Sequence, residues 1–135
     1  MALILADTDV LIDYLAGAQP VTAQIAGYIK ADQLETSAVT CFELLSGATS
    51  GKRAKTLRVL IDALTILPLD RHAAERAAEV RQNLDRSGQA IGMGDSLIAG
   101  IARANHVPLF TRNRRHFERV PDLKLVTVQE SVAGQ

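Results

Sequence analysis

Three acidic residues from separate parts of the sequence each stand among apolar residues. Asp7 follows the run ALILA, Glu43 lies in CFELL, and Asp95 lies in GMGDSLIAGIA. Two carboxylates 4 Å apart repel each other by roughly 4 kcal/mol at an effective dielectric constant of about 20, so a cluster of them needs a counter-charge. Oxygen ligands suit Mg²⁺ or Mn²⁺, and such an ion activates water for phosphodiester hydrolysis. If these acids meet, they predict a Mg²⁺ or Mn²⁺ site.

Each acid alone also has an ordinary explanation. Asp7 could start a turn, Glu43 could be a surface carboxylate, and Asp95 could cap a helix. Asp9 is interpreted first as a helix cap, and Asp13 as part of a solvated helix face. The three acids Asp7, Glu43 and Asp95 together carry more weight than any one of them, because two interrupt otherwise apolar or small-residue segments.

The segment FTRNRRHFER supplies further polar groups. Asn113 is expected to join the acids, with Thr111 and Asp9 as secondary candidates. His116 is not expected to act as a base. Arginine suits bidentate contacts with phosphate. The residues expected at a phosphate-binding rim are Arg112, Arg114, Arg115 and Lys52.

Hydrophobic patterning predicts the elements that would position these groups. Apolar runs are typical of short strands over 3–6, 34–37, 65–67, 107–111 and 123–128. Helical spacing predicts helices over 9–15, 20–30, 39–46, 52–64 and 71–87, and one that begins at Gly94 or Asp95 and runs to 105. Strands that alternate with helices indicate a mainly parallel sheet of four to five strands between two helical layers. In such a fold the site lies at the carboxyl ends of the strands, where Asp7 would be.

The bulk properties favour one soluble domain. The chain has 135 residues and a formal net charge of zero, so a single domain over 1–135 and no overall basic field are expected. The single Cys41 cannot form an internal disulfide. The opening MALILA is too short for a signal peptide, and no apolar run approaches the ~20 residues of a membrane span. A cytoplasmic protein is therefore expected.

The motifs together resemble PIN-domain ribonucleases, specifically the VapC type of toxin from type II toxin–antitoxin modules. ADTDVLIDYL resembles the family's opening, SAVTCFELLSG its second motif, IGMGDSLIAGIA its third, and LFTRNRRHFERVPDLKL its closing segment. The resemblance covers nearly the full length. It implies a PIN-like three-layer α/β/α sandwich and a divalent-metal-dependent endoribonuclease.

Residue roles and partners are also implied by this resemblance. Asp7, Glu43 and Asp95 would be metal ligands, whereas Asn113 stands where a fourth acid is often found, which makes a one-metal state more plausible. The implied partners are RNA, a VapB-like antitoxin and a second copy of the chain, without a membrane. The helices over 20–30 and 52–64 are the candidate walls of the antitoxin groove.

Two alternatives stay open at this point. The stretch LADTDVL also resembles the opening of haloacid-dehalogenase-like phosphatases, in which Asp7 would be the nucleophile and Asp9 a general acid. A non-catalytic PIN-like RNA-binding module is the second alternative, suggested by Asn113. The first leaves Glu43 unexplained, and the intact set of Asp7, Glu43 and Asp95 argues against the second.

Overall fold

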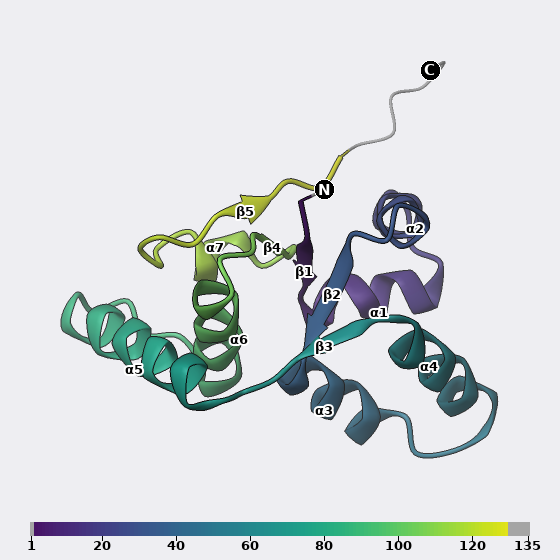
Figure 1. Cartoon of the computed structure of the whole chain (residues 1–135), viewed down its shortest axis with the longest axis horizontal. Helices are drawn as coiled ribbons and strands as arrows, with labels where there is room; N and C mark the ends of the chain where they lie inside the picture. The colour runs from purple at the N-terminus through teal and green to yellow at the C-terminus, as the bar shows by residue number, and fades with distance from the viewer. Residues whose placement is uncertain (1, 130–135) are drawn as a thin grey trace.

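The computed structural model describes residues 2–129 and contains a five-stranded sheet between two helical layers (Figure 1). The strands are β1 (Ile4–Ala6), β2 (Leu34–Ser37), β3 (Thr65–Leu67), β4 (Leu109–Phe110) and β5 (Leu125–Val126). The helices are α1 (Thr8–Ala16), α2 (Val21–Lys30), α3 (Ala38–Gly47), α4 (Gly51–Ala63), α5 (Arg71–Arg86), α6 (Met93–Ala104) and α7 (Arg114–Phe117).

All four strand pairings are parallel, and the strand order is β3-β2-β1-β4-β5. The central strand β1 pairs Ala6 with Thr36 of β2 on one side and with Phe110 of β4 on the other. This register places Asp7, Ser37 and Thr111, the residues at the ends of three neighbouring strands, at one edge of the sheet. The predicted fold class is therefore confirmed.

The period of two along β1 divides its side chains between two apolar cores. Ile4 and Ala6 belong to the core beneath α1, α2 and α4, whereas Leu5 belongs to the core beneath α5 and α6. All three residues are buried, because helices cover both faces of the central strand. Figure 1 shows α5 and α6 on one side of the sheet and α1, α2 and α4 on the other.

Most predicted elements are present with shifts of one or two residues at their ends. The strands over 34–37 and 65–67 have the predicted bounds, and the last two strands are shorter than predicted. The short helix α7 was not predicted. The helix cap was assigned to the wrong residue: Asp7, not Asp9, is the N-cap of α1, and Asp9 lies in its first turn. Asp95 likewise lies in the first turn of α6, whose N-cap is Gly92.

A close contact between α5 and α6 fixes the helical layer that carries Asp95. Gly100 of α6 has no room for a side chain: a Cβ there would lie 2.5 Å from the Cβ and the backbone nitrogen of Ala77 and 2.6 Å from the carbonyl oxygen of Ala73. Small residues on both helices therefore let the two backbones approach, and α6 cannot shift outward without losing this packing.

No helix within residues 2–129 is both long enough and apolar enough to span a lipid bilayer.

Replacing Gly100 with alanine is expected to destabilise the fold. The added methyl group would overlap backbone atoms of α5, and such overpacking costs about 1–3 kcal/mol. For a domain of this size the melting temperature should fall by roughly 5–10 °C, measured by circular dichroism. Gly27→Ala is the matched control, because a Cβ at that helical position would meet nothing within 4 Å. Equal melting temperatures for Gly100→Ala and the wild type would contradict the packing argument.

Candidate active site

Asp7 is a buried carboxylate at the end of β1, with only 4% of its surface exposed. Its Oδ1 accepts a hydrogen bond from the Thr8 backbone N–H at 2.8 Å, and its Oδ2 accepts one from the Thr111 hydroxyl at 2.7 Å. The pairing of β1 with β4 brings Thr111 to Asp7, since the Asp7 N–H donates to the Phe110 carbonyl at 2.9 Å. Both carboxylate oxygens are therefore held in place from two separate segments of the chain.

Burial raises the pKa of Asp7 to about 7 from an ordinary value of 3.8. Burial is the largest cause of this value; the negative charges of Asp9 and Asp95 also act to raise the pKa, whereas the hydrogen bonds from Thr111 and Thr8 act to lower it. Desolvation and like charge both disfavour the ionised form. Burial and like charge therefore outweigh the two hydrogen bonds that stabilise the Asp7 carboxylate.

Asp9 lies next to this pair and is held by the same segment after β4. Its Oδ2 accepts a hydrogen bond from the Arg112 backbone N–H at 3.1 Å, and the Thr111 hydroxyl lies 3.4 Å away. Burial raises the pKa of Asp9 as well. Asp7, Asp9 and Thr111 thus form one contiguous group of oxygen atoms, so the structure brings the two secondary candidates, Asp9 and Thr111, next to Asp7.

The interpretation of Asp13 as a solvated surface residue is wrong. Its carboxylate forms a two-pronged salt bridge with the Arg112 guanidinium, with Nε at 2.5 Å and one terminal nitrogen at 3.3 Å. Only 19% of the Asp13 side chain is exposed. This salt bridge anchors the segment after β4 to α1. It also holds the Arg112 backbone in the position from which its N–H donates to Asp9.

Glu43 is connected to the group through Thr8, a residue that the sequence reasoning missed. The Thr8 hydroxyl donates to Glu43 Oε1 at 2.6 Å and lies 3.0 Å from the Thr40 hydroxyl. The other carboxylate oxygen, Oε2, lies beside α6, since a Cβ on Gly94 would be 3.5 Å from it. The sequence did offer a signal for Thr8. It stands between Asp7 and Asp9, two residues after the end of β1, so its hydroxyl was bound to lie close to the acids at that edge of the sheet.

Asp95 meets His116, which was not expected to take part. Asp95 Oδ2 lies 3.0 Å from His116 Nδ1, and the same nitrogen lies 2.8 Å from Asn113 Nδ2. The Asn113 backbone N–H donates to the Thr111 hydroxyl at 3.0 Å. Asn113 therefore joins the segment after β4 to Asp95. A sequence signal for His116 was its three-residue spacing from Asn113, the N-cap of α7.

The chemical type of these side chains suits a hard divalent cation, because most of their donor atoms are carboxylate and hydroxyl oxygens. As they stand, however, no three His, Cys, Asp or Glu side chains within residues 2–129 are grouped so that they could hold a metal ion. Glu43 and Asp95 turn toward Thr8 and His116 instead of toward Asp7. The predicted residues thus share one edge of the sheet, but direct contact among the three main acids is not present.

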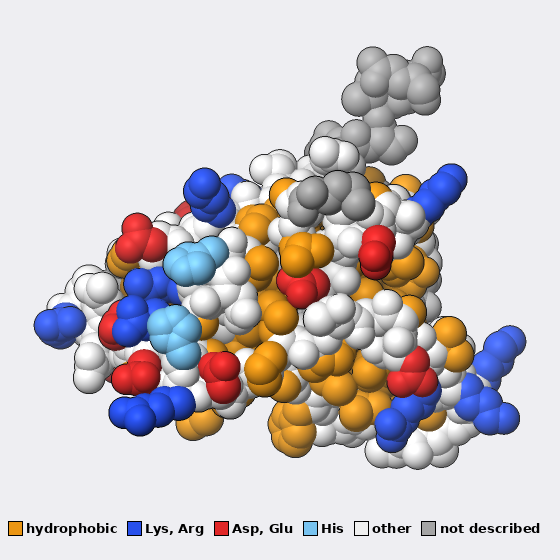
Figure 2. Space-filling view, viewed as in Figure 1, with side chains coloured by type: hydrophobic (Ala, Val, Ile, Leu, Met, Phe, Trp, Pro, Cys, Tyr) orange, Lys and Arg blue, Asp and Glu red, His pale blue; other side chains and the backbone are white. Residues whose placement is uncertain are grey.

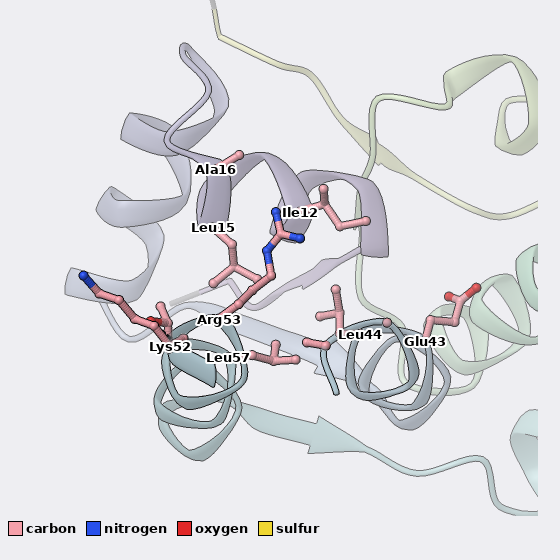
Figure 3. Close-up of a pocket in the computed structure, with 11 residues that line it drawn as sticks. Ile12, Leu15, Ala16, Glu43, Leu44, Lys52, Arg53 and Leu57 are labelled. Atoms are coloured by element: carbon pink, nitrogen blue, oxygen red, sulfur yellow. Dashed lines mark hydrogen bonds between the residues drawn. The ribbon is translucent and has the colours of Figure 1, made fainter. Parts of the chain in front are cut away.

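An apolar pocket of about 490 Å³ lies next to this site, between α1, α3 and α4 (Figure 3). It is lined by Ile12, Leu15, Ala16, Glu43, Leu44, Gly47, Ala48, Lys52, Arg53, Thr56 and Leu57. In Figure 3 Arg53 extends from α4 toward α1, whereas the Glu43 carboxylate points toward α6. Of the two predicted groove walls, only the helix over 52–64 lines this pocket, because α1 takes the place expected for the helix over 20–30.

Asp7→Asn is expected to stabilise the metal-free protein at neutral and higher pH. Below pH 3.8 both folded and unfolded states hold the Asp7 proton; between 3.8 and about 7 only the folded state does, so stability falls as pH rises through this window. The shift corresponds to a few kcal/mol, or roughly 5–15 °C in melting temperature. Melting curves in EDTA at pH 5 and pH 8 measure this difference.

Asp62→Asn is the control for this comparison, because Asp62 is exposed on α4. Asp9 and Glu35 also have pKa values raised by burial, so part of the pH slope remains in Asp7→Asn. If the melting temperature of Asp7→Asn falls with pH as steeply as that of the wild type, Asp7 ionises in the folded protein without a loss of stability, and the expectation is wrong.

Comparison with known proteins gives one consistent result. The sequence profile of the PIN domain family matches residues 4–123. The chain is 33% identical to "Ribonuclease VapC10" of Mycobacterium tuberculosis over 90% of its own length and 91% of that protein's. It is 34% identical to the "tRNA(fMet)-specific endonuclease VapC" of Shigella flexneri over 65% of its length and 70% of that protein's.

The fold agrees with these relatives. A crystal structure of DNA-bound VapBC from Salmonella typhimurium superposes with a TM-score of 0.80 and 25% identity, over 93% of this chain and 98% of the solved one. VapBC2 from Rickettsia felis, bound to a promoter DNA fragment, gives a TM-score of 0.79 at 22% identity over 92% and 97% of the two chains, which is a likeness of fold. The chain therefore belongs to the PIN-domain family, among the VapC ribonucleases.

Proposed function

We propose that this chain is a divalent-metal-dependent endoribonuclease that acts as the toxin of a toxin–antitoxin pair. PIN-domain ribonucleases use divalent metal ions in general, and for this chain the proposed ion is Mg²⁺ or Mn²⁺. The observation that carries the proposal is Asp7, a buried acid with a raised pKa at the carboxyl edge of the sheet. A single domain over 1–135 in the cytoplasm is part of the same proposal, and the PIN match spans 4–123.

Asp7, Glu43 and Asp95 are the proposed metal-holding residues, with Asn113 as a neutral neighbour. When bound, a divalent ion would lower the pKa of a water molecule and offset charge that develops on a phosphate. Thr111 and the Thr8 N–H hold the Asp7 carboxylate in one orientation, and the Arg112 N–H does the same for Asp9. These contacts preorganise the oxygen atoms, which limits the rearrangement needed when an ion binds.

The phosphatase alternative is less consistent with this geometry. That family's opening implies a loop after the Asp-x-Asp stretch, but helix α1 begins at Thr8, directly after Asp7. The phosphatase reading also gives no role to Glu43, which is joined to this site through the Thr8 hydroxyl. The non-catalytic alternative is tested by the cleavage assay below.

RNA is the proposed substrate, since the relatives are named as ribonucleases and one as a tRNA endonuclease. Arg114 and Arg115, the two residues after Asn113, are exposed on α7, and Lys52 is exposed on α4. They are the proposed phosphate contacts, whereas the Arg112 guanidinium is already paired with Asp13. Such contacts position RNA without specifying its sequence.

The proposed antitoxin site is the pocket between α1, α3 and α4. Solved relatives are VapBC complexes. The pocket offers apolar side chains for the hydrophobic side of a partner segment, and Figure 3 shows Lys52 and Glu43 on opposite sides of it, with Arg53 between them. A peptide with an apolar face and charged ends fits this arrangement.

A homodimer is also proposed. Phe42, Leu69 and Met93 are respectively 69%, 40% and 65% exposed. They come from α3, the segment between β3 and α5, and the start of α6, and α3 contacts both β3 and α6. Figure 2 shows hydrophobic side chains gathered across the middle of one face around an acidic side chain, with most other charged groups toward the edges of that face. A surface of this kind favours association with a second copy.

Replacing single acids should abolish RNA cleavage while the fold is kept. Asp7→Asn and Asp95→Asn each remove a charge that would balance the metal, and a loss of roughly 100-fold or more in kcat/KM is expected. Cleavage of a labelled RNA by purified protein in Mg²⁺ or Mn²⁺ measures this loss. Circular dichroism verifies the fold, and Asp62→Asn is the matched surface control.

Two further readouts decide between the alternatives. Full activity of Asp7→Asn and Asp95→Asn would overturn the assignment of the acids, and no cleavage by the wild type with either metal would favour the non-catalytic module. A covalent phosphate trapped on Asp7 would support the phosphatase instead.

A charge placed in the pocket should prevent capture of the antitoxin. Ile12 lines the pocket and is 52% exposed, so Ile12→Glu can be accommodated by the free protein but would bury a carboxylate in the complex. Coexpression with a VapB-like antitoxin that the wild-type chain captures, followed by affinity purification, should show loss of the complex. Val59→Glu is the control, because Val59 is 72% exposed on α4 and does not line the pocket. Retention by Ile12→Glu would place the partner elsewhere.

A further inference from the structure

The first two turns of α4 carry a concentration of positive charge. Lys52, Arg53, Lys55 and Arg58 are all exposed, and Asp62 is the single acid of this helix. Within the part of the chain that the structure describes, none of these four cations forms a salt bridge. In Figure 2 Lys and Arg side chains gather over α4, toward the lower right of the view, with one acidic side chain among them. Four cations and one acid give α4 a net formal charge of +3, in a chain whose formal net charge is zero.

Helix α5 shows how an ordinary solvated helix of the same protein arranges its charges. Its four arginines alternate with three acids, and two ion pairs form between neighbouring turns. Helix α4 has no acid in its first turn, and its N-cap Ser50 makes no side-chain hydrogen bond. Lys52 and Arg53 lie in that first turn, where a positive charge opposes the helix dipole. An anion bound from outside the chain would offset this unfavourable charge.

The position of α4 places these cations across the pocket from the acids. In the strand order β3-β2-β1-β4-β5, α4 contacts α3 and β3 on one side of β1, whereas α7 follows β4 on the other side (Figure 1). Lys52 and Glu43 line the same pocket, and Glu43 accepts the hydrogen bond from Thr8 beside Asp7. The cations of α4 and those of α7 therefore flank Asp7 from opposite sides.

We propose that the outer side of α4, with Lys52, Lys55 and Arg58, is a second phosphate-binding surface for RNA, so that a bound RNA extends from the acids across the pocket to this helix. The inference rests on the proposed function, because it concerns the same substrate. The three cations are spaced three residues apart, so they are neighbours on the helix surface, about 4.5 Å from one to the next along the axis. Each can pair with a phosphate of a backbone whose charge repeats along its length.

The chemistry of this surface favours a polyanion over a protein partner. Lysine is depleted at protein–protein interfaces, whereas phosphate backbones are bound mainly by Lys and Arg. The apolar side chains that would anchor a peptide, among them Leu15, Leu44 and Leu57, line the pocket instead. The outer side of α4 exposes Val59, which offers a small apolar area to a protein. The pocket and the outer side of α4 thus suit different partners.

Neutralising the two cations outside the pocket tests the proposal. In an Asp7→Asn background with EDTA, which keeps the RNA intact, Lys55→Gln/Arg58→Gln should weaken binding of labelled transfer RNA roughly fivefold to tenfold at about 0.1 M salt. The slope of log Kd against log salt should fall by about 1.5 to 2, because two phosphate contacts are lost. Fluorescence anisotropy over a series of salt concentrations measures both quantities.

Two controls separate a binding role from other causes. Arg71→Gln/Arg81→Gln removes the same charge from exposed positions on α5, in the other helical layer, and should bind RNA as Asp7→Asn alone does. Because Lys55 and Arg58 form no salt bridge within the described residues, their replacement should leave the melting temperature by circular dichroism unchanged.

The outcomes distinguish this inference from the proposed function. An unchanged Kd and salt slope for Lys55→Gln/Arg58→Gln, or an equal loss in the α5 control, would overturn the role of α4 while RNA cleavage by the wild type keeps the ribonuclease. If the α4 variant binds RNA normally but no longer captures a VapB-like antitoxin, the surface belongs to the antitoxin and the inference is wrong. A wild type that neither cleaves nor binds RNA would overturn both.

Discussion

The burial of a carboxylate at the end of the central strand is the constraint on which the rest of the site depends. Asp7 cannot be solvated where it lies, so neighbouring groups must provide its hydrogen bonds. Thr8 does so from the start of α1 and Thr111 from the end of β4. The Thr111 contact joins the first and last thirds of the chain at this point. The remaining polar residues of the site are attached to this point through Thr8 or Thr111.

The layers of the fold and the position of Asp7 at the carboxyl edge of the sheet could be predicted from the sequence. Strand and helix periods are local properties, and the short apolar run before Asp7 was sufficient to place that acid at the carboxyl edge. Thr8 and His116 were missed for a different reason. Their importance comes from contacts with Glu43 and Asp95, which lie 35 and 21 residues away in the chain. A periodic pattern carries no information about such pairs.

Asp9 and Asp13 show how a helical pattern can mislead. An acid near a helix start is usually a cap, and an acid one turn later is usually solvated. Here Asp7 already caps α1, which leaves Asp9 to accept the Arg112 N–H and Asp13 to pair with the Arg112 side chain. The N-cap and the first turns of α1 therefore present three acids toward the segment after β4. The residue identities were visible, but the neighbour that they face was not.

The contact at Gly100 has a consequence for how the site is assembled. Asp95 lies five residues before Gly100, or about 7.5 Å along α6, so its position follows from how closely α6 rests on α5. Asp7, by contrast, is placed by backbone pairing within the sheet. The site is thus built in two parts with separate origins, one set by strand register and one by helix packing. Substitutions at the α5–α6 contact can alter the spacing between the acids while every residue that touches the substrate stays the same.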